Sequence, residues 1–207
     1  MTMAETADST QDSTAADAPA RRHRTTTTDI ALIAAFAALI SACAYIGGIP
    51  VGGGQVAITL QTFGVMLAGA LLGPWRGFLA VALYLALGAA GLPVFSEHSS
   101  GLGTFSSASA GYLWSFPVAA LLTGLLVKYV AGSHRTSALA VFACAVPGMV
   151  LNHLAGVVGM KLFFDISWPT AFTYDAPFWL GDVIKILVVA LVAAEVHRAF
   201  PQLLRRR

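Results

Sequence analysis

The amino-acid sequence predicts an all-α polytopic membrane protein, a bundle of six transmembrane helices with the N-terminus and the C-terminus in the cytoplasm. Three observations predict this fold: an apolar composition, six apolar runs and a one-sided placement of basic residues. Hydrophobic residues make up 57% of the 207-residue chain, charged residues only 11%, and the mean hydropathy is +0.75. A soluble domain carries about 25% charged residues, so this chain has too little polar material to cover a surface in water.

Six apolar runs mark the expected helices. Only helices or closed barrels satisfy the backbone in lipid, and these runs lack the alternation of barrel strands. Six spans of about 20 residues fit within the chain and leave short loops. The second run is short for a span, so we expect it to be tilted or to begin earlier, within residues 56–59. The runs cover residues 30–46, 60–72, 75–92, 112–130, 138–160 and 178–200.

Glycine, proline and polar residues separate the runs. Residues 47–54 (GGIPVGGG) predict a flexible, irregular segment, and the Gly-Pro pair at 73–74 predicts a tight turn. The longest polar loop covers residues 92–109, and shorter connections cover residues 132–136 and 165–177.

The basic residues predict the orientation. With the N-terminus in the cytoplasm and six alternating spans, ten of the twelve Lys and Arg residues fall on the cytoplasmic side. Cytoplasmic loops carry an excess of Lys and Arg, so this asymmetry supports six spans with both ends inside. The ten residues are Arg21, Arg22, Arg24, Arg76, Lys128, Arg135, Arg198, Arg205, Arg206 and Arg207, which leaves Lys161 and Lys185 towards the outer face.

The chain divides into a tail and one membrane domain. Residues 1–20 are rich in Ala, Thr, Ser and Asp and have no apolar face, so we expect residues 1–28 to form a disordered cytoplasmic tail. Acidic residues precede the basic cluster at residues 21–24, unlike a secretory signal, so the first apolar run is interpreted as a retained helix. Residues 29–207 then form a single membrane domain.

Asp182 and Lys185 are a charged pair about one turn inside the sixth predicted span. Three residues apart on a helix, they lie on one face. An ionisable side chain in lipid is costly and is by default a functional candidate. Two alternatives stay open: an ion pair that only holds the sixth helix against its neighbours, and a lysine that extends to the membrane interface.

The chemistry of this pair suits a small polar ligand. A carboxylate accepts hydrogen bonds from two N–H donors, and an ammonium binds a carboxylate or a carbonyl oxygen. These groups match a molecule that carries an acid and a cyclic urea or amide. Because the pair lies in the outer half of its helix, the ligand would arrive from outside, beneath residues 47–59 and 92–109. The glycines of these two loops permit close approach of the backbone to a ligand or a hinge-like movement of the loop. The alternative is that the two loops are only flexible connectors.

Other intramembrane polar residues are weaker candidates. Gln61 opens the second helix, where it would hydrogen-bond a ligand or cap the loop. Tyr84 and Tyr112 are more typical of packing. Asn152 and His153 favour hydrogen bonds between helices.

Small residues four positions apart indicate close helix contacts. Ala31 and Ala35 show this spacing in the first helix, and Gly69 and Gly73 show it in the second. Such faces let helices approach closely in lipid. Packing within the bundle and docking of a partner subunit both stay open.

Common catalytic motifs are absent from the sequence. It contains no G-x-x-x-x-G-K-[ST], no G-x-S-x-G and no H-E-x-x-H, so we expect this chain not to be an enzyme. Its five histidines form no metal-binding pattern. The alternatives from other classes are an intramembrane serine protease, using Ser41 or Ser115 with His153, and a structural or channel protein.

The chain resembles the BioY family, the biotin-specific substrate-binding (S) components of energy-coupling-factor transporters. The resemblance lies in ITLQTFGVMLAGALLGPWRGFLAVALYLALGAAGLPVF (58–95), SASAGYLWSFPVAALLTGLL (107–126) and APFWLGDVIKILVVA (176–190). It extends over residues 30–200. Where family members often have a denser glycine run this chain has SEHSSGLG (96–103), a departure that affects the loop contacts rather than the charged pair.

The resemblance implies a six-helix bundle in the cell membrane that captures biotin near its extracellular face. It implies a membrane coupling subunit and two cytoplasmic ATPases as partners, with no cofactor, metal or nucleic acid. Ala31 and Ala35 match the small-residue motif by which such subunits dock. An S component for another small vitamin is the second choice. The implied biotin contacts are Asp182, Lys185, Gln61, Tyr84, Ser100 and Gly101, with the urea ring and the carboxylate not apportioned between Asp182 and Lys185.

Overall fold

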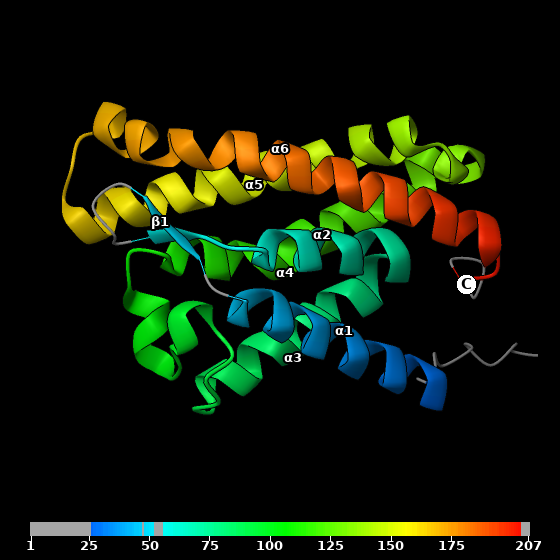
Figure 1. Cartoon of the computed structure of the whole chain (residues 1–207), viewed down its shortest axis with the longest axis horizontal. Coiled ribbons are helices and arrows are strands. Elements are labelled where there is room, and N and C mark those ends of the chain that lie inside the picture. The colour runs from blue at the N-terminus through cyan, green and yellow to red at the C-terminus, as the bar shows by residue number, and fades with distance from the viewer. Residues whose placement is uncertain (1–25, 47, 52–55, 204–207) are drawn as a thin grey trace, which may run out of the picture.

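Six α-helices and a short β-hairpin make up the described part of the chain (Figure 1). The computed structural model describes residues 26–46, 48–51 and 56–203. In the hairpin, β1 (Ile49–Val51) pairs antiparallel with β2 (Val56–Ile58). Two 3₁₀ turns, η1 (Ser96–His98) and η2 (Leu102–Ser106), lie between α3 and α4, and α4 continues into a π-helical segment, η3 (Leu126–Ala131), and a 3₁₀ turn, η4 (Gly132–Thr136). The helices are α1 (Thr27–Tyr45), α2 (Gln61–Leu72), α3 (Pro74–Ala89), α4 (Ala110–Leu125), α5 (Ala138–Phe164) and α6 (Trp168–Ala199).

Local sequence signals explain where several helices begin. The Asp29 N–H donates to the Thr26 hydroxyl at 3.2 Å and the Thr26 N–H donates to the Asp29 carboxylate at 3.1 Å, a capping box that starts α1. Gly73 has a φ of +79°, which favours glycine, and Pro74 begins α3 directly after it. The predicted turn between the second and third helices is therefore confirmed.

Among the described residues, four helical stretches are long and apolar enough to cross a membrane: Thr27–Tyr45, Ala110–Thr136, Ala138–Phe164 and Trp168–Ala199. α2 has 12 residues and α3 has 16, lengths of about 18 and 24 Å against a hydrocarbon core of about 30 Å. The predicted all-α fold with apolar helices of membrane-spanning length is confirmed, whereas the count of six spans, which needs α2 and α3 to cross the bilayer, and the orientation of the two ends stay predictions.

α2 and α4 lie at the centre of the packing, and α2 contacts all five other helices. α4 contacts α2, α3 and α5, while α6 packs against α5 and α2, and α1 against α2 and α3. The helices approach closely at Gly69 of α2, where an added Cβ would overlap the backbone carbonyl of Ala120 in α4. A Cβ on Gly77 of α3 would lie 2.9 Å from the Cα of Gly69. Of the two readings of its spacing, Gly69 serves packing within the bundle.

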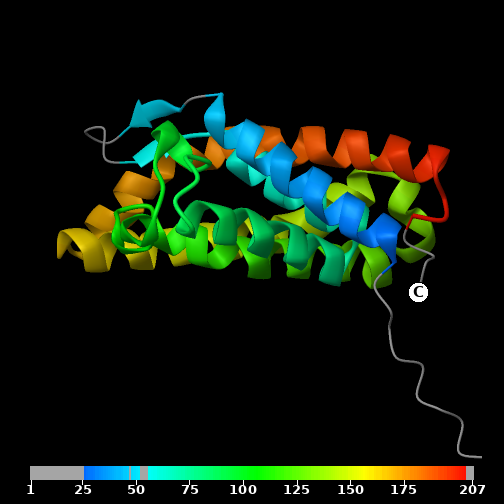
Figure 2. The ribbon, with the colours of Figure 1, turned by 90° about the horizontal axis from the view of Figure 1, so that it is seen from below.

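The start of α1 and the end of α6 lie at the same end of the bundle, and the hairpin lies at the other (Figures 1 and 2). Arg76, at the start of α3, contacts Asp29 of α1 at 3.3 Å and donates to the Leu203 carbonyl at 2.7 Å. Arg135 donates to the Pro201 carbonyl at 3.1 Å. Two arginines that the sequence assigns to one side of the membrane therefore both contact the residues that follow α6, at one end of the molecule.

Several predicted boundaries are wrong. α6 begins at Trp168, so most of the expected connection over residues 165–177 is helical, with Ser167 as its cap. Residues 56–58 form a strand instead of extending α2, and the segment expected to be irregular contains β1. Of the predicted disordered tail, residues 1–25 lie outside the described residues, and Thr27 and Thr28 belong to α1.

Candidate functional site

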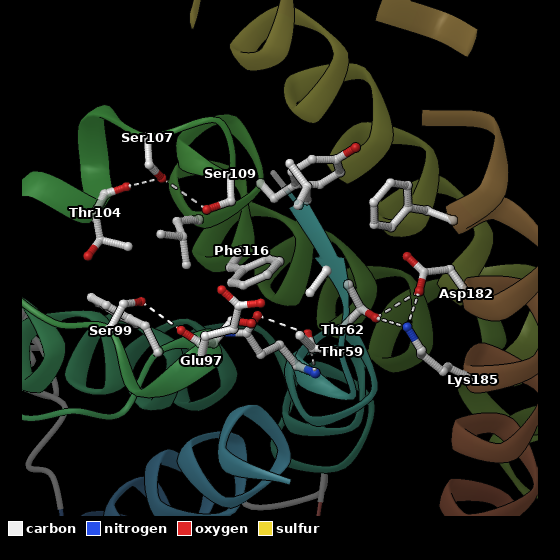
Figure 3. A pocket seen from close by; sticks show the side chains of 18 of the residues that line it. Thr59, Thr62, Glu97, Ser99, Thr104, Ser107, Ser109, Phe116, Asp182 and Lys185 are labelled. Atoms are coloured by element: carbon white, nitrogen blue, oxygen red, sulfur yellow. Dashed lines mark hydrogen bonds and ion pairs between the residues drawn. The ribbon is translucent and has the colours of Figure 1, made fainter. Parts of the chain in front are cut away.

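A cavity of about 380 Å³ lies at the hairpin end of the bundle, a size typical of small-molecule sites. β2, α2, α4, α6 and the connection between α3 and α4 all contribute to its wall (Figure 3). The lining residues are Val56, Ala57, Thr59, Gln61, Thr62, Phe95, Ser96, Glu97, Ser99, Gly103, Thr104, Ser107, Ser109, Tyr112, Leu113, Phe116, Phe178, Asp182 and Lys185.

Asp182 and Lys185 form an ion pair in this wall. The Lys185 Nζ lies 2.6 Å from the Asp182 Oδ1, and the two side chains are only 10% and 5% exposed. Thr62 of α2 donates to the same Oδ1 at 2.9 Å and accepts from Lys185 at 3.3 Å (Figure 3). Among the described residues two of the three ammonium donors thus have partners, and the third has none.

Both interpretations of the pair have support from this geometry. Thr62 completes the pair from a neighbouring helix, as a purely structural ion pair requires. Both Asp182 and Lys185 also line the cavity, as a binding role requires. Their role in ligand binding stays a prediction.

Gln61 lines the cavity, and Tyr84 lies behind it. The Gln61 Nε2 donates to the Tyr84 hydroxyl oxygen at 2.6 Å, and the Thr59 hydroxyl donates to the Gln61 Oε1 at 2.9 Å. Tyr84 is fully buried and meets the Phe95 ring edge-on, with centroids 5.4 Å apart. Tyr84 is therefore placed to orient Gln61, and it is not a lining residue.

Ser100 and Gly101 shape the α3–α4 connection and do not line the cavity. Gly101 has a φ of +81°, and its N–H donates to the Gly88 carbonyl at 2.7 Å. The Ser100 carbonyl accepts from the Thr104 hydroxyl at 3.2 Å. Their neighbours in the same loop line the cavity instead, and the signal that would have found them is the density of hydroxyl residues in 96–109.

The cavity has polar groups on two sides. Figure 3 shows Thr104, Ser107 and Ser109 on the side away from Asp182 and Lys185, with Phe116 between the two groups. The Ser107 hydroxyl donates to the Thr104 carbonyl at 2.8 Å and lies 3.0 Å from the Ser109 hydroxyl. A side that carries the ion pair and a side lined by hydroxyls, separated by an aromatic ring, suit an elongated ligand that is polar at both ends, and the carboxylate of Glu97 also lines the cavity.

A second buried polar cluster lies behind the ion pair, and sequence reasoning missed two of its four residues, Asp175 and Trp179. The His153 Nδ1 on α5 lies 2.8 Å from the Asp175 Oδ1 on α6, so the predicted helix–helix hydrogen bond of His153 is confirmed. The Tyr112 hydroxyl donates to the same oxygen at 2.6 Å, and the Trp179 Nε1 donates to Asp175 Oδ2 at 2.6 Å. Asp175 was overlooked because residues 165–177 were assigned to a loop.

The two serines of the protease alternative donate elsewhere. The Ser115 hydroxyl donates to the Asn152 Oδ1 at 2.7 Å, which confirms the predicted interhelical hydrogen bond of Asn152. The Ser41 hydroxyl donates to the Ala37 carbonyl within its own helix at 2.9 Å. Neither geometry is that of a serine activated by His153.

One face of α1 carries exposed small residues. Ala31 and Ala35, the predicted docking pair, are both exposed, and so are Ala34 and Ala38. The pairing of this exposed face with a partner stays a prediction.

Comparison with known proteins now decides the family. The sequence profile of the BioY family matches residues 14–202 of this chain. The chain belongs to the BioY family. The biotin transporter BioY of Rhodobacter capsulatus is 40% identical over 188 residues, which cover 86% of this chain and 98% of that protein. The biotin transporter BioY of Rhizobium etli is 36% identical over 182 residues, covering 86% and 97%.

A solved structure shares the fold of this chain. The crystal structure of the S-component for biotin from an ECF-type ABC transporter matches with a TM-score of 0.80 at 26% identity. The match covers 86% of this chain and 95% of the other. Together with the apolar helices, these relatives show that this BioY family member is a multi-pass protein of the plasma membrane.

Proposed function

We propose that this chain is the biotin-binding membrane subunit of an energy-coupling-factor transporter. It captures biotin from the outside and delivers it by reorientation that partner ATPases power; it performs no chemistry on its ligand. The observation that carries the proposal is the cavity of about 380 Å³ with a buried ion pair in its wall, found in a family whose relatives are named biotin transporters.

The chemistry of the cavity supports biotin as the ligand. Biotin carries a cyclic urea at one end and a carboxylate at the other. Asp182 is an acceptor for urea N–H groups, and Lys185 is a donor for a carboxylate or a urea oxygen. The hydroxyls on the opposite side of the cavity supply donors and acceptors for the other end of the molecule. Gln61 completes the polar wall, while Tyr84, Ser100 and Gly101 hold Gln61 and the loop in place.

The arrangement of the ends supports the proposed topology. We place six spans in the bilayer, a cytoplasmic tail over residues 1–28 and a single membrane domain over residues 29–207. An even number of passes brings both termini to one side, and the start of α1 and the end of α6 do lie together (Figure 2). The positive-inside rule makes that the cytoplasmic side, because Arg76 and Arg135 lie there. The cavity then faces the outside.

The sequence contains no phosphate-binding loop, so an ATPase that powers transport would be a separate subunit. We propose a membrane coupling subunit and two cytoplasmic ATPases. The exposed small-residue face of α1 supports docking there, since such faces let helices approach closely in lipid.

Biotin will stabilise the purified protein against heat, and other vitamins will not. A ligand that binds only the folded state at about 100 times its Kd adds about 2.7 kcal/mol of stability, a rise in Tm of about 5–10 °C for a chain of this size. Thermal unfolding with biotin, thiamine, riboflavin and pantothenate measures it. A shift with only one of the other three vitamins would favour an S component for that vitamin. No shift with any of the four vitamins would refute vitamin capture.

Leucine at both Ala31 and Ala35 will prevent docking without affecting biotin binding. Two larger side chains hold a partner helix away from α1. The measurement is co-purification with a coexpressed coupling subunit and its two ATPases, together with biotin binding by the isolated chain. Ala143→Leu, on an exposed position of α5, is the matched control and will co-purify normally. Equal co-purification of the double variant and the control would contradict the docking assignment.

A further inference from the structure

Glu97 of η1 is a third charged residue in the cavity lining, beside Asp182 and Lys185. The residue is exposed although it lines the cavity, so it lies where the cavity opens to the outside. Figure 3 shows Glu97 and Lys185 on opposite sides of Thr59. The Glu97 carboxylate makes no hydrogen bond or ion pair with another described residue. The opening of the cavity therefore carries a carboxylate that the fold itself does not pair.

The η1 turn holds Glu97 in place from both sides. Phe95, two residues before it, is buried and meets the Tyr84 ring edge-on, with centroids 5.4 Å apart. The Phe95 N–H donates to the Ser99 carbonyl at 3.2 Å, and the Ser99 hydroxyl donates to the Ser96 carbonyl at 2.7 Å. Because these bonds close the turn and a core ring anchors it, the position of Glu97 follows from the fold.

The backbone at this turn favours glycine. Glu97 has a φ of +56° and His98 has a φ of +60°, both in the left-handed region. Residues other than glycine are strained in this region, and such strain is typical of functional sites. It falls in the segment SEHSSGLG, where family members often have a denser glycine run. This chain therefore keeps an acidic side chain at a position that glycine would occupy more easily.

The charged groups of the lining do not balance. Lys185 is the only cation among the described lining residues, and its Nζ lies 2.6 Å from the Asp182 Oδ1. With Glu97, two carboxylates and one ammonium leave one negative charge. The carboxylate of free biotin adds a second negative charge, whereas a ligand with one positive charge would make the lining and the ligand neutral together.

The cyclic urea of biotin fits the ion pair better than its carboxylate does. A urea has N–H donors on both sides of one carbonyl oxygen, and Asp182 and Lys185 offer an acceptor next to a donor. A ligand carboxylate at the same place would meet the like charge of Asp182. With the urea at the ion pair, the tail of an elongated ligand extends to the other side of the cavity, where Glu97 lies (Figure 3).

We propose that Glu97 selects ligands by the charge of their tail, so that this chain binds biotin amides with an ammonium group more tightly than uncharged biotin amides of the same size. This inference rests on the proposed biotin site. The chemical class is biotin joined through its carboxyl group to a diamine. The amide bond removes the negative charge of biotin, and the ammonium pairs with Glu97. Because Glu97 is exposed, the preference is that of an exposed pair, about two- to fivefold in affinity.

Two matched amides that compete with labelled biotin test this preference. The aminoethyl amide of biotin carries an ammonium, and the hydroxyethyl amide has the same length without a charge. The purified parent will bind the aminoethyl amide about two- to fivefold more tightly at low ionic strength. The difference will shrink at an ionic strength of about 1 M, where charges are screened beyond about 3 Å.

Substitutions at Glu97 will change the order of the two amides. Glu97→Gln will bind both amides equally, and Glu97→Lys will prefer the hydroxyethyl amide. Both variants will bind free biotin more tightly than the parent does, because its carboxylate no longer meets a like charge. Glu195→Gln is the matched control, since it removes an exposed carboxylate of α6 that does not line the cavity, and it will retain the parental preference.

Three results would overturn the inference. They are equal binding of the two amides by the parent at low ionic strength, an unchanged preference in Glu97→Gln, and failure of both amides to compete where biotin itself binds. The last result would mean that the ligand tail does not reach the opening. Absence of biotin binding by a well-folded parent would refute the proposed function instead, and this inference would fall with it.

Discussion

Lys185→Met and Asp182→Asn will each reduce the affinity for biotin by about 10- to 100-fold. Each variant removes a charged hydrogen-bonding group from the cavity wall, and a hydrogen bond to a charged group contributes about 1.5–3 kcal/mol, which equals that loss in affinity. The buried partner that stays behind also loses its counter-charge, since the two groups are 2.6 Å apart. Equilibrium binding of biotin to the purified variants measures the effect.

α6 provides a matched control for this experiment. Glu195 and Arg198 form the same acid–base pair three residues apart, at 2.6 Å, but their side chains are 68% and 62% exposed. Exposed pairs contribute little, so Glu195→Gln and Arg198→Ala will bind biotin like the parent. If Lys185→Met and Asp182→Asn also bind like the parent while remaining folded, the pair is only structural and the site assignment is wrong.

Gly69→Val will destabilise the protein by about 3 kcal/mol, the upper end of the range for overpacked sites. A Cβ at this position overlaps the backbone carbonyl of Ala120, and a backbone segment cannot rotate away as a side chain can. α2, α3 and α4 meet at Gly69, so all three helices would have to move. Thermal unfolding in detergent will show a Tm lower by about 6–12 °C.

Gly103→Ala is the control for this substitution. Gly103 has open space around it, and an added Cβ meets no heavy atom within 4 Å. Its Tm will stay within a few degrees of the parental value, because surface changes of this kind are usually worth less than about 0.5 kcal/mol. A stable Gly69→Val protein would mean that the α2–α4 crossing is looser than the described backbone.

Local patterns in the chain were sufficient to predict the helices, the apolar exterior and the candidate pair. Apolar runs and the distribution of Lys and Arg depend on whether a segment is surrounded by lipid or by water, and most of this chain is apolar enough for lipid. Asp182 and Lys185 stand out for the same reason, as rare charges in an apolar run. Ala31 and Ala35 are exposed, as the docking interpretation of their spacing requires. The start of α6 was not predicted, because the apolar run begins only at residue 178, whereas the helix begins at Trp168 with a proline in its first turn, a position that favours a helix.

Only the tertiary structure decided what surrounds the charged pair. Thr62 lies 123 residues from Lys185 in the chain, and Tyr112 lies 63 residues from Asp175. Contacts of that separation depend on which helices pack together and at which rotation, and in lipid that choice is made by close side-chain fit between helices rather than by apolar character. For this reason His153, an ordinary polar residue in the sequence, proves to lie between two buried carboxylates. The sequence by itself determined that the protein lies in a membrane with a charged pair near one end, and the packing of distant helices determined the cavity and the partners of that pair.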